Sequence, residues 1–292
     1  MFAYYFNKTP MQIFYGKAAL IDYLKAIKTN HSSIGFVPTM GALHQGHLSL
    51  MQQSIMENQV TVVSIFVNPT QFNNPEDLAK YPRTLEEDIK KIAEFNPEII
   101  IFAPTTEDIY EGNPSSQFFD FDGLENQMEG KFRPGHFNGV GTIVKRFFEI
   151  VEPTNAYFGE KDFQQLQIVK KMVAKNNLKV TIKGCPIFRD ANNLAMSSRN
   201  ALLSPKEKLE ASVIYKTLVG AKAKFKTNSA ASVSEWVEKS LEKNQDFKLE
   251  YFQIADENTL LPCLRKNKGK KYRAFIAVFV NNIRLIDTIS LN

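Results

Sequence analysis

Short apolar runs alternate with amphipathic stretches along the first 185 residues of the chain. The apolar cluster at residues 33–38 predicts a buried strand, because it follows polar residues and stops at a Pro-Thr-Met-Gly turn. Leucines after this turn predict a helix that runs toward Asn58. The same order repeats, with predicted strands at residues 60–67, 98–102, 156–158 and 180–182 and predicted helices at residues 83–95, 140–150 and 162–176.

This alternation predicts a parallel sheet with helices on both faces, because parallel neighbours need crossover connections that cover the sheet. We therefore expect an α/β fold with a doubly wound, Rossmann-like domain at residues 1–185. The pattern then changes to helix, helix, strand and hairpin, at residues 205–225, 233–243, 249–254 and 273–288. A smaller C-terminal α+β domain is expected at residues 186–292.

The composition is that of an ordinary globular protein. Hydrophobic residues make up 43% of the 292 residues and charged residues 23%, which excludes disordered, collagen-like and disulfide-scaffold proteins. The net charge of +5 suits anionic small molecules as readily as nucleic acid. Cys185 and Cys263 are too few for a secreted scaffold, and no apolar run approaches the roughly 20 residues that span a bilayer. We expect a cytoplasmic protein without a membrane partner.

The turn after the first predicted strand holds the most informative stretch, residues 38–47, which reads PTMGALHQGH. His44 and His47 are three residues apart at a predicted helix start, where exposed backbone N–H groups and the helix dipole favour an anion. Imidazoles there can donate hydrogen bonds to phosphate oxygens. Gly41 and Gly46 would allow close approach of the backbone or of a ligand, and Gly46 leaves room for an adenine or a ribose.

A zinc pair and two surface histidines are the alternative interpretations of this stretch. Zinc usually needs a third protein ligand, and the other two histidines, His31 and His136, have no cysteine near them in the sequence. Phosphate binding is therefore favoured over metal binding.

A second polar cluster, residues 159–165, follows a later predicted strand and reads GEKDFQQ. In an open α/β sheet, ligands bind outside the carboxyl ends of the strands, so this turn and the first one can face the same crevice. Lys161 would meet a phosphate as a point charge, and Asp162 is the expected N-cap of its helix. Gln164 and Gln165 carry amides that both donate to and accept from a hydroxylated carboxylate.

Three further segments carry groups of the same kind. The polar loop with Ser197, Ser198 and Arg199 would clamp phosphates by closing on the crevice, although Ser-Ser-Arg alone is common in surface loops. Gln71 follows the second predicted strand, where it can contact a polar substrate. The turn at residues 133–137 carries an arginine and a histidine, with either a packing or a substrate-facing role.

Taken in order along the chain, these segments resemble the pantothenate synthetase family, the pantoate–β-alanine ligases, which belong to the nucleotidylyl transferases. The resemblance covers nearly the whole chain and rests on residues 38–47, 66–72, 81–84, 133–137, 157–166, 196–200 and 284–287. Its His-x-Gly-His and Ser-Ser-Arg segments are also similar to the two signatures of class I aminoacyl-tRNA synthetases.

The resemblance implies an ATP-dependent ligase that condenses (R)-pantoate with β-alanine and releases AMP and pyrophosphate by way of a pantoyl adenylate. It implies a homodimer and Mg²⁺ held mainly by the ATP phosphates, with no protein side chain assigned as a metal ligand. Small molecules are then the expected partners. Nucleic acid is not, because the residues after the first domain leave little room for an anticodon-binding part and show no aromatic RNA-binding motif.

The resemblance also assigns residues to roles. His47, His44 and Lys161 would be catalytic, with His47 as the family's proton donor, and Gln71 and Gln165 would bind pantoate, with β-alanine entering beside Gln71. The ATP-binding positions that it implies are Met40, Gly41, Ala42, Leu43, His44, Gln45, Gly46, His47, Gly159, Glu160, Lys161, Asp162, Phe188, Met196, Ser197, Ser198 and Arg199.

Two positions depart from the family pattern. Asn192 and Asn193 stand where Asp-Gly is expected, and asparagine tolerates left-handed backbone conformations better than most residues. Phe188 replaces a smaller aliphatic residue whose backbone contacts adenine. Neither change removes a charged or nucleophilic group, so both are compatible with activity.

Two other functions fit parts of the pattern. An adenylyl transferase that acts on a phosphate ester or a mononucleotide would need additional arginines for its acceptor, whereas the uncharged amides of Gln71 and Gln165 suit a hydroxy acid. A catalytically silent ATP-binding protein would not need the intact histidines, Lys161 and Ser-Ser-Arg.

Overall fold

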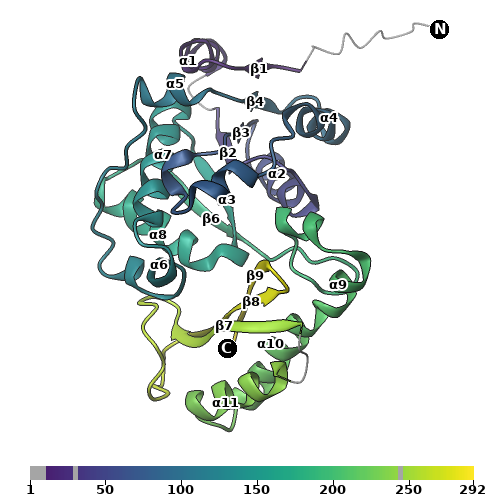
Figure 1. Cartoon of the computed structure of the whole chain (residues 1–292). Coiled ribbons are helices and arrows are strands. Elements are labelled where there is room, and N and C mark those ends of the chain that lie inside the picture. The colour runs from purple at the N-terminus through teal and green to yellow at the C-terminus, as the bar shows by residue number, and fades with distance from the viewer. Residues whose placement is uncertain (1–10, 29–31, 243–245) are drawn as a thin grey trace, which may run out of the picture.

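The structure, a computed structural model, describes residues 11–28, 32–242 and 246–292 of the chain. Its elements form a larger α/β part from the N-terminal elements and a smaller α+β part from the C-terminal ones (Figure 1). His31, and Lys243 at the end of one predicted helix, lie outside the described residues. No helix within these ranges is long and apolar enough to cross a bilayer.

A six-stranded, all-parallel sheet forms the centre of the larger part. From edge to edge its strands are β1 (Ile13–Phe14), β4 (Ile100–Phe102), β3 (Val60–Ile65), β2 (Ile34–Thr39), β5 (Asn155–Gly159) and β6 (Thr181–Cys185). The chain winds outward from β2 through β3 to β4 and then returns to the other side of β2 with β5, so the winding direction reverses there. Open α/β sheets bind ligands at such a reversal, outside the carboxyl ends of the strands.

Alternate residues of each strand face two separate cores, and this explains the two helix layers. Val62 belongs to the core on one face and Val63 to the core on the other, as the period of two in a strand requires. The first core takes in α1 (Lys17–Ile27), α7 (His136–Val151) and α8 (Phe163–Lys175), and the second takes in α2 (Gln45–Glu57) and α4 (Leu85–Phe95). The predicted doubly wound fold class is thereby confirmed.

The smaller part packs three helices on a three-stranded antiparallel sheet. Its helices are α9 (Pro205–Glu210), α10 (Ser212–Phe225) and α11 (Ala230–Leu241), and its sheet has the order β7 (Phe247–Asp256), β8 (Tyr272–Val280) and β9 (Ile283–Ser290). A third core, which includes Leu218, Val237 and Ile276, lies between them. The predicted C-terminal α+β part is confirmed as a fold.

Several local predictions were incomplete. The helix expected at residues 205–225 is divided at Ala211 into α9 and α10. Sequence patterns also missed β1, α1 and the short helices α3 (Pro75–Lys80), α5 (Thr106–Tyr110) and α6 (Met128–Phe132). The missed elements other than α1 have two to six residues, too few positions for a periodicity to be recognised.

Two helix starts lack the side-chain cap that their sequences favour. Thr84 and Glu87 occupy capping-box positions before α4, yet the Thr84 side chain makes no cap and instead donates to the Asp88 carboxylate at 3.1 Å. Asp162 stands at the N-cap position of α8 without a side-chain cap, and its carboxylate pairs with Lys161. Each side chain is drawn away from its backbone N–H groups by a competing polar partner.

Polar contacts join the two parts near the carboxyl edge of the parallel sheet. Arg284 of β9 pairs with Glu129 of α6 at 2.7 Å, and Arg273 of β8 pairs with Glu160 at 3.1 Å. The Ser198 hydroxyl donates to the carbonyl of Ala42 at 3.1 Å. The smaller part is therefore attached along the edge at which a doubly wound sheet binds ligands.

Candidate active site

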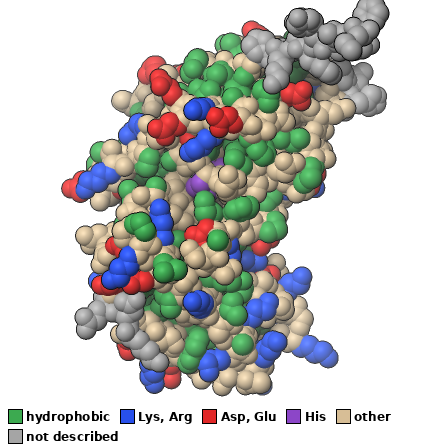
Figure 2. Space-filling view, turned by 90° about the vertical axis from the view of Figure 1, so that its right-hand side faces the viewer, with side chains coloured by type: hydrophobic (Ala, Val, Ile, Leu, Met, Phe, Trp, Pro, Cys, Tyr) green, Lys and Arg blue, Asp and Glu red, His purple; other side chains and the backbone are tan. Residues whose placement is uncertain are grey.

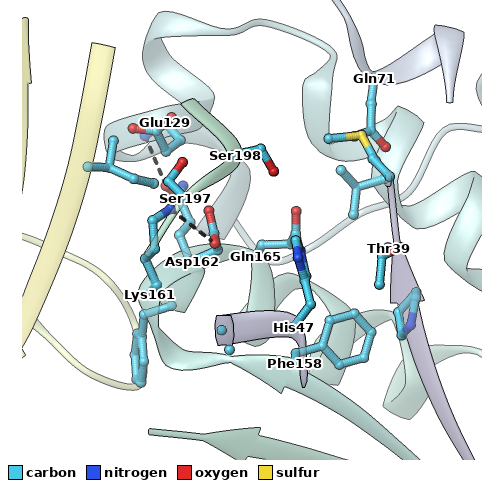
Figure 3. Close-up of a pocket in the computed structure, with 18 of the residues that line it drawn as sticks. Thr39, His47, Gln71, Glu129, Phe158, Lys161, Asp162, Gln165, Ser197 and Ser198 are labelled. Carbon is cyan, nitrogen blue, oxygen red and sulfur yellow. Dashed lines mark hydrogen bonds and ion pairs between the residues drawn. The ribbon is translucent and has the colours of Figure 1, made fainter. Parts of the chain in front are cut away.

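A pocket opens at the carboxyl edge of the parallel sheet. The segments that follow β2, β3, β5 and β6 line it, together with residues 196–199 and side chains from α6, α7, β7, β8 and β9. Figure 2 shows histidine side chains exposed in a hollow near the middle of this face. In Figure 3, Lys161, Asp162 and Glu129 lie on one side of the pocket, Thr39 and Gln71 lie on the other, and His47 and Gln165 lie between them.

Most of the sequence candidates come together in this pocket. Those that line it are Met40, His44, Gly46, His47, Gln71, Gly159, Lys161, Asp162, Gln165, Phe188, Met196, Ser197, Ser198 and Arg199. Those that do not line it are Gly41, Ala42, Leu43, Gln45 and Glu160. Gln45 is exposed on the first turn of α2, and Glu160 is engaged by Arg273, so neither side chain is directed at a ligand here.

The turn between β2 and α2 is held by a buried carboxylate rather than left open for a phosphate. Gly41 and Ala42 both have positive φ, +79° and +49°, which turns successive N–H groups toward one point. Asp88 of α4 occupies that point: its Oδ2 accepts from the Ala42 N–H at 2.8 Å and its Oδ1 from the Leu43 N–H at 2.7 Å. The backbone N–H groups that the sequence suggested for anion binding are thus already satisfied.

The carbonyl groups of the same turn have partners as well. Lys91 of α4 donates to the Leu43 carbonyl at 2.9 Å, and Ser198 donates to the Ala42 carbonyl. Asp88 is fully buried and also accepts from the Thr84 hydroxyl. The side chains of Asp88, Lys91 and Ser198 therefore fix the backbone that leads directly into His44.

His44 and His47 cap the start of α2 with their own rings. The Gly46 N–H donates to Nδ1 of His44 at 3.1 Å, and the His44 N–H donates to Nδ1 of His47 at 3.3 Å. Because each Nδ1 accepts a hydrogen bond, the proton of each neutral ring must sit on Nε2. The two stacked rings therefore present Nε2–H donors rather than lone pairs.

Both imidazoles are neutral near pH 7. Burial, followed by the charge of Lys161, lowers the pKa of His44 to about 4. Burial, followed by the proximity of His44 and Lys161, lowers the pKa of His47 well below its usual value of 6.5. The pair can donate hydrogen bonds to an anion without carrying a charge.

Gly46 has a different purpose from the one that the sequence suggested. A Cβ at this position would lie 2.9 Å from the His44 ring and 3.3 Å from Cβ of Met196. The capping imidazole and the loop therefore lie directly beside the Gly46 Cα, which also lines the pocket. Glycine at this position lets His44 fold back over its own helix.

Lys161 and Arg199 bring positive charge to the pocket and hold only loose ion pairs. Lys161 Nζ lies 3.5 Å from Asp162 Oδ2, the pair drawn as a dashed line in Figure 3, and Arg199 lies 3.7 Å from Asp77 of α3. The side chains of Asp162 and Asp77 are 48% and 44% exposed. Exposed pairs of this length contribute little to stability, so a phosphate can replace either partner.

The loop that carries Ser197 and Ser198 directly follows a tight hairpin. Arg189 and Ala195 form an antiparallel bridge, and the Met196 N–H donates to the Phe188 carbonyl at 3.0 Å. Asn193 has a φ of +67°, the left-handed conformation that the Asp-Gly of the family pattern would adopt with less strain. The Asn193 departure is accommodated, and Phe188 stands at the pocket with 42% of its surface exposed.

The two neighbouring glutamines of α8 have different tasks. The Gln164 amide is buried and bonded to the backbone of Leu124, Gln127 and Glu129. Gln165 also lines the pocket, but its side chain has no hydrogen-bond partner among the residues that the structure describes. Its amide is therefore available to a ligand.

Gln71 is fixed by residues that carried little or no signal in the sequence. Asn68 donates to its Oε1 at 3.2 Å, and the ring of His136 bonds to its backbone carbonyl at 2.7 Å. Burial and the charge of Arg133 lower the pKa of His136 to about 4, so this ring is neutral and donates from Nδ1.

Sequence analysis missed Asp88 entirely. The available signal was an acidic residue four positions before Ile92, on the apolar face of a helix.

Within the described ranges, no group of three or more His, Cys, Asp or Glu side chains is arranged to hold a metal ion.

The doubly wound sheet, with neutral histidines, a lysine and a Ser-Ser-Arg loop around a pocket at its carboxyl edge, defines a nucleotide-binding α/β enzyme. The chain belongs to the pantoate–β-alanine ligase family, whose family model matches residues 12–290. The resemblance stated from the sequence is thereby confirmed, and with it the ligase activity of the family.

Relatives that this chain matches over their full length support this membership. The pantothenate synthetase of Flavobacterium psychrophilum is 65% identical over 281 residues, which covers 96% of this chain and 100% of that protein. The pantothenate synthetase of Christiangramia forsetii is 53% identical over 282 residues, with 97% and 100% covered.

Solved structures of the family have the same fold. Pantothenate synthetase from Thermus thermophilus matches with a TM-score of 0.86 at 38% identity, covering 96% of this chain and 99% of that one. Pantoate-β-alanine ligase from Francisella tularensis, complexed with beta-gamma ATP and β-alanine, matches with a TM-score of 0.77 at 34% identity, with 96% and 98% covered.

Replacing Asp88 tests whether its carboxylate positions the histidines. We expect Asp88→Asn to lower the free energy of unfolding by about 1 to 3 kcal/mol, because an amide cannot accept from both N–H groups. At temperatures at which the variant is folded, kcat should fall at least about tenfold, with KM for ATP changing less. Urea unfolding and steady-state kinetics measure both effects. Glu86→Gln on the exposed side of α4 is the control, and unchanged kcat in folded Asp88→Asn would contradict the positioning role.

The neutral histidines predict a fall in stability below neutral pH. The pKa of His136 is lower in the folded protein, about 4, than the 6.5 of an unfolded chain, so only the unfolded state takes up a proton between these values. From pH 7 to pH 5 this should remove about 2 kcal/mol of unfolding free energy for His136 alone. Carboxylates with a lowered pKa, such as Glu129, change the unfolding free energy only at pH values below this range. Urea unfolding should show a shallower pH dependence in His136→Asn; an unchanged slope would contradict the prediction.

Proposed function

We propose that this protein condenses (R)-pantoate with β-alanine and converts ATP to AMP and pyrophosphate by way of a pantoyl adenylate. The observation that carries this proposal is the set of groups in one pocket: two neutral Nε2–H imidazoles, a loosely paired lysine and amides from two different turns. Family membership supports the same reaction.

In the first half-reaction, a pantoate carboxylate oxygen attacks the α-phosphorus of ATP, and pyrophosphate leaves. Negative charge then spreads over the phosphate oxygens, in line with the attack. We infer that His44 and His47 donate hydrogen bonds from Nε2 to these oxygens and that Lys161 adds its positive charge. Since both rings are neutral, neither needs to gain or lose a proton for this stabilisation.

We assign the departing pyrophosphate to the loop with Ser197, Ser198 and Arg199. Two hydroxyl groups and a guanidinium there offer donors for the β- and γ-phosphates. Met40, Gly46, Gly159, Phe188 and Met196 line the remainder of the proposed ATP site. Gly41 to Leu43 act indirectly, because the Gly41 N–H already donates to the Thr39 hydroxyl oxygen and Asp88 accepts from the N–H groups of Ala42 and Leu43.

Gln165 and Gln71 are proposed to bind pantoate. An amide can donate to the carboxylate and accept from the hydroxyl groups of a hydroxy acid, and it does not repel the ATP phosphates. Apolar lining residues such as Val140, Ile143 and Phe158 suit the dimethyl carbon of pantoate.

In the second half-reaction, the β-alanine amine attacks the activated carbonyl carbon and AMP leaves. The adenylate must be protected from hydrolysis, which requires a closed site with little water. The contact between Ser198 and Ala42 supports a role of this loop in covering the pocket.

Mg²⁺ is proposed to enter with ATP and to be held by its phosphates. The carboxylates that line the pocket have other partners: Glu129 bonds to Arg284, Asp287 to Arg189 and Asp162 to Lys161. When bound, the ion neutralises phosphate charge, and few protein ligands are needed for that.

The organisation of the whole protein is also proposed. We infer a Rossmann-like domain at residues 1–185 and a lid domain at residues 186–292, supported by the end of the parallel sheet at Cys185 and the separate core of the smaller part. A cytoplasmic homodimer with small-molecule partners and no nucleic acid or membrane partner follows from the family resemblance.

Release of AMP by the purified protein tests the reaction directly. With Mg-ATP present, and with pantoate and β-alanine omitted singly and together, we expect AMP to form in quantity only with both substrates. Pantothenate should appear in equal amount, because each condensation consumes one ATP. Absence of AMP with both substrates present would contradict the proposal and indicate another adenylyl acceptor.

Replacing His47 or Lys161 tests the assigned donors. We expect His47→Ala and Lys161→Ala each to lower kcat at least about 10²-fold, as loss of a group that stabilises transition-state charge typically does. Pantothenate formation at saturating substrates measures this loss. Lys170→Ala, at an exposed lysine of the following helix α8, is the control for Lys161→Ala. Near-normal turnover in either active-site variant would exclude the role assigned to it.

A further inference from the structure

Arg133 is a pocket arginine that the proposed reaction has not yet used. It ends α6, and its guanidinium lines the pocket beside the segment that carries Gln71. Nη1 donates to Nε2 of His136 at 3.3 Å, and Nη2 donates to the Gln71 carbonyl at 3.4 Å. Both acceptors are neutral, so they orient the guanidinium without cancelling its charge.

The other pocket cations each have a carboxylate partner. Lys161 pairs with Asp162, Arg199 with Asp77, and Arg284 with both Glu129 and Glu250. Arg133 has no carboxylate within 4.0 Å in the part of the chain that the structure describes.

Glu129 is close enough to Arg133 to interact with it, but its oxygens are already occupied. They accept from Arg284 at 2.9 and 2.7 Å and from the Tyr251 hydroxyl at 2.8 Å. Arg199 and Arg284 add positive charge near Arg133, and Asp77, the ion-pair partner of Arg199, adds negative charge. A positive, preoriented and unpaired guanidinium therefore remains in the pocket, and a carboxylate or phosphate can neutralise it.

The chemistry of the reactants decides which anion suits this place. The pantoate carboxylate is itself the nucleophile, so it must lie at the α-phosphorus beside His44, His47 and Lys161. The ATP phosphates already have proposed partners in Lys161 and the loop with Ser197 to Arg199. The carboxylate of the amine substrate takes no part in bond formation and stays charged throughout, so it needs a permanent cation on the pantoate side of the pocket.

We propose that Arg133 binds the carboxylate of the amino-acid substrate and thereby selects β-alanine over amines that lack a negative charge. This inference rests on the proposed function. His136 serves as a positioning residue, because its neutral ring links the Arg133 guanidinium to the Gln71 backbone. A rigidly held guanidinium also fixes the distance from the carboxylate to the attacking amine, which favours a short ω-amino acid of one length.

Substrate discrimination in Arg133 variants tests the proposal. We expect Arg133→Gln to raise KM for β-alanine about 10²-fold, because a charge-assisted hydrogen-bonded pair is lost. The preference for β-alanine over β-alaninamide, measured as the ratio of kcat/KM values, should fall toward one. Arg133→Lys, which keeps the charge, should retain a clear preference for β-alanine.

The glutamine variant separates carboxylate binding from a packing role. Its amide can still donate to His136 and to the Gln71 carbonyl. If Arg133 only held these two groups in place, activity would therefore be retained better in Arg133→Gln than in Arg133→Lys. Higher activity in Arg133→Gln than in Arg133→Lys would overturn the proposal. An unchanged ratio of kcat/KM for β-alanine to kcat/KM for β-alaninamide in Arg133→Gln would also overturn it. Arg265→Met, at an exposed position of the C-terminal part, controls for the change in net charge.

Pantoate-dependent exchange of pyrophosphate into ATP keeps this test distinct from that of the proposed function, because the exchange needs no β-alanine. We expect Arg133→Gln to retain exchange within about threefold of the unsubstituted protein, which also demonstrates that it is folded. Loss of exchange in this variant alone would show that Arg133 serves the first half-reaction and would overturn the inference. Absence of exchange in the unsubstituted protein would instead contradict the proposed function.

Discussion

The site depends on one buried carboxylate that occupies the place of an anion. Asp88 accepts two backbone N–H groups from a turn with two successive left-handed residues, Gly41 and Ala42. Without an acceptor, those N–H groups would be buried and unsatisfied, at a cost of about 1 to 3 kcal/mol each. Since the following residue is His44, the carboxylate sets where α2 begins and where its two rings point. The position of the two imidazoles is therefore determined by a contact between α4 and the turn, not by the turn alone.

Ion pairs across the boundary complete the pocket. Arg284 joins Glu129 of the larger part to Glu250 of the smaller one, with N–O distances near the short end of the normal range for Glu129. A buried ion pair adds little net stability, but breaking it leaves a charge without a partner, which strongly disfavours other relative placements of the two parts. These residues thus specify how the smaller part is seated over the carboxyl edge of the sheet.

The sequence predicted the fold class and most of the pocket because both depend on short-range patterns. β-Branched and apolar runs locate the strands, and polar residues directly after them must lie at the carboxyl edge. Contacts between distant residues carry no such pattern. The separation of 46 residues between Ala42 and Asp88 hid this contact, and with it the fact that the N–H groups of Ala42 and Leu43 already have an acceptor. The role of Gly46 was missed likewise, because the fold-back of the His44 ring is visible only in three dimensions.

The lengths of the ion pairs distinguish the side-chain cations that hold the structure together from those that a ligand can bind. Arg284 and Arg189 hold carboxylates at 2.7 Å, with side chains no more than 17% exposed. Lys161 and Arg199 have partners at 3.5 and 3.7 Å whose carboxylates are almost half exposed. Water screens the second pair of contacts, so an incoming phosphate displaces them at little cost. Because the histidines are neutral, the electrostatic attraction for a phosphate comes from these loosely held cations. The imidazoles orient the phosphate through their hydrogen bonds and add no charge.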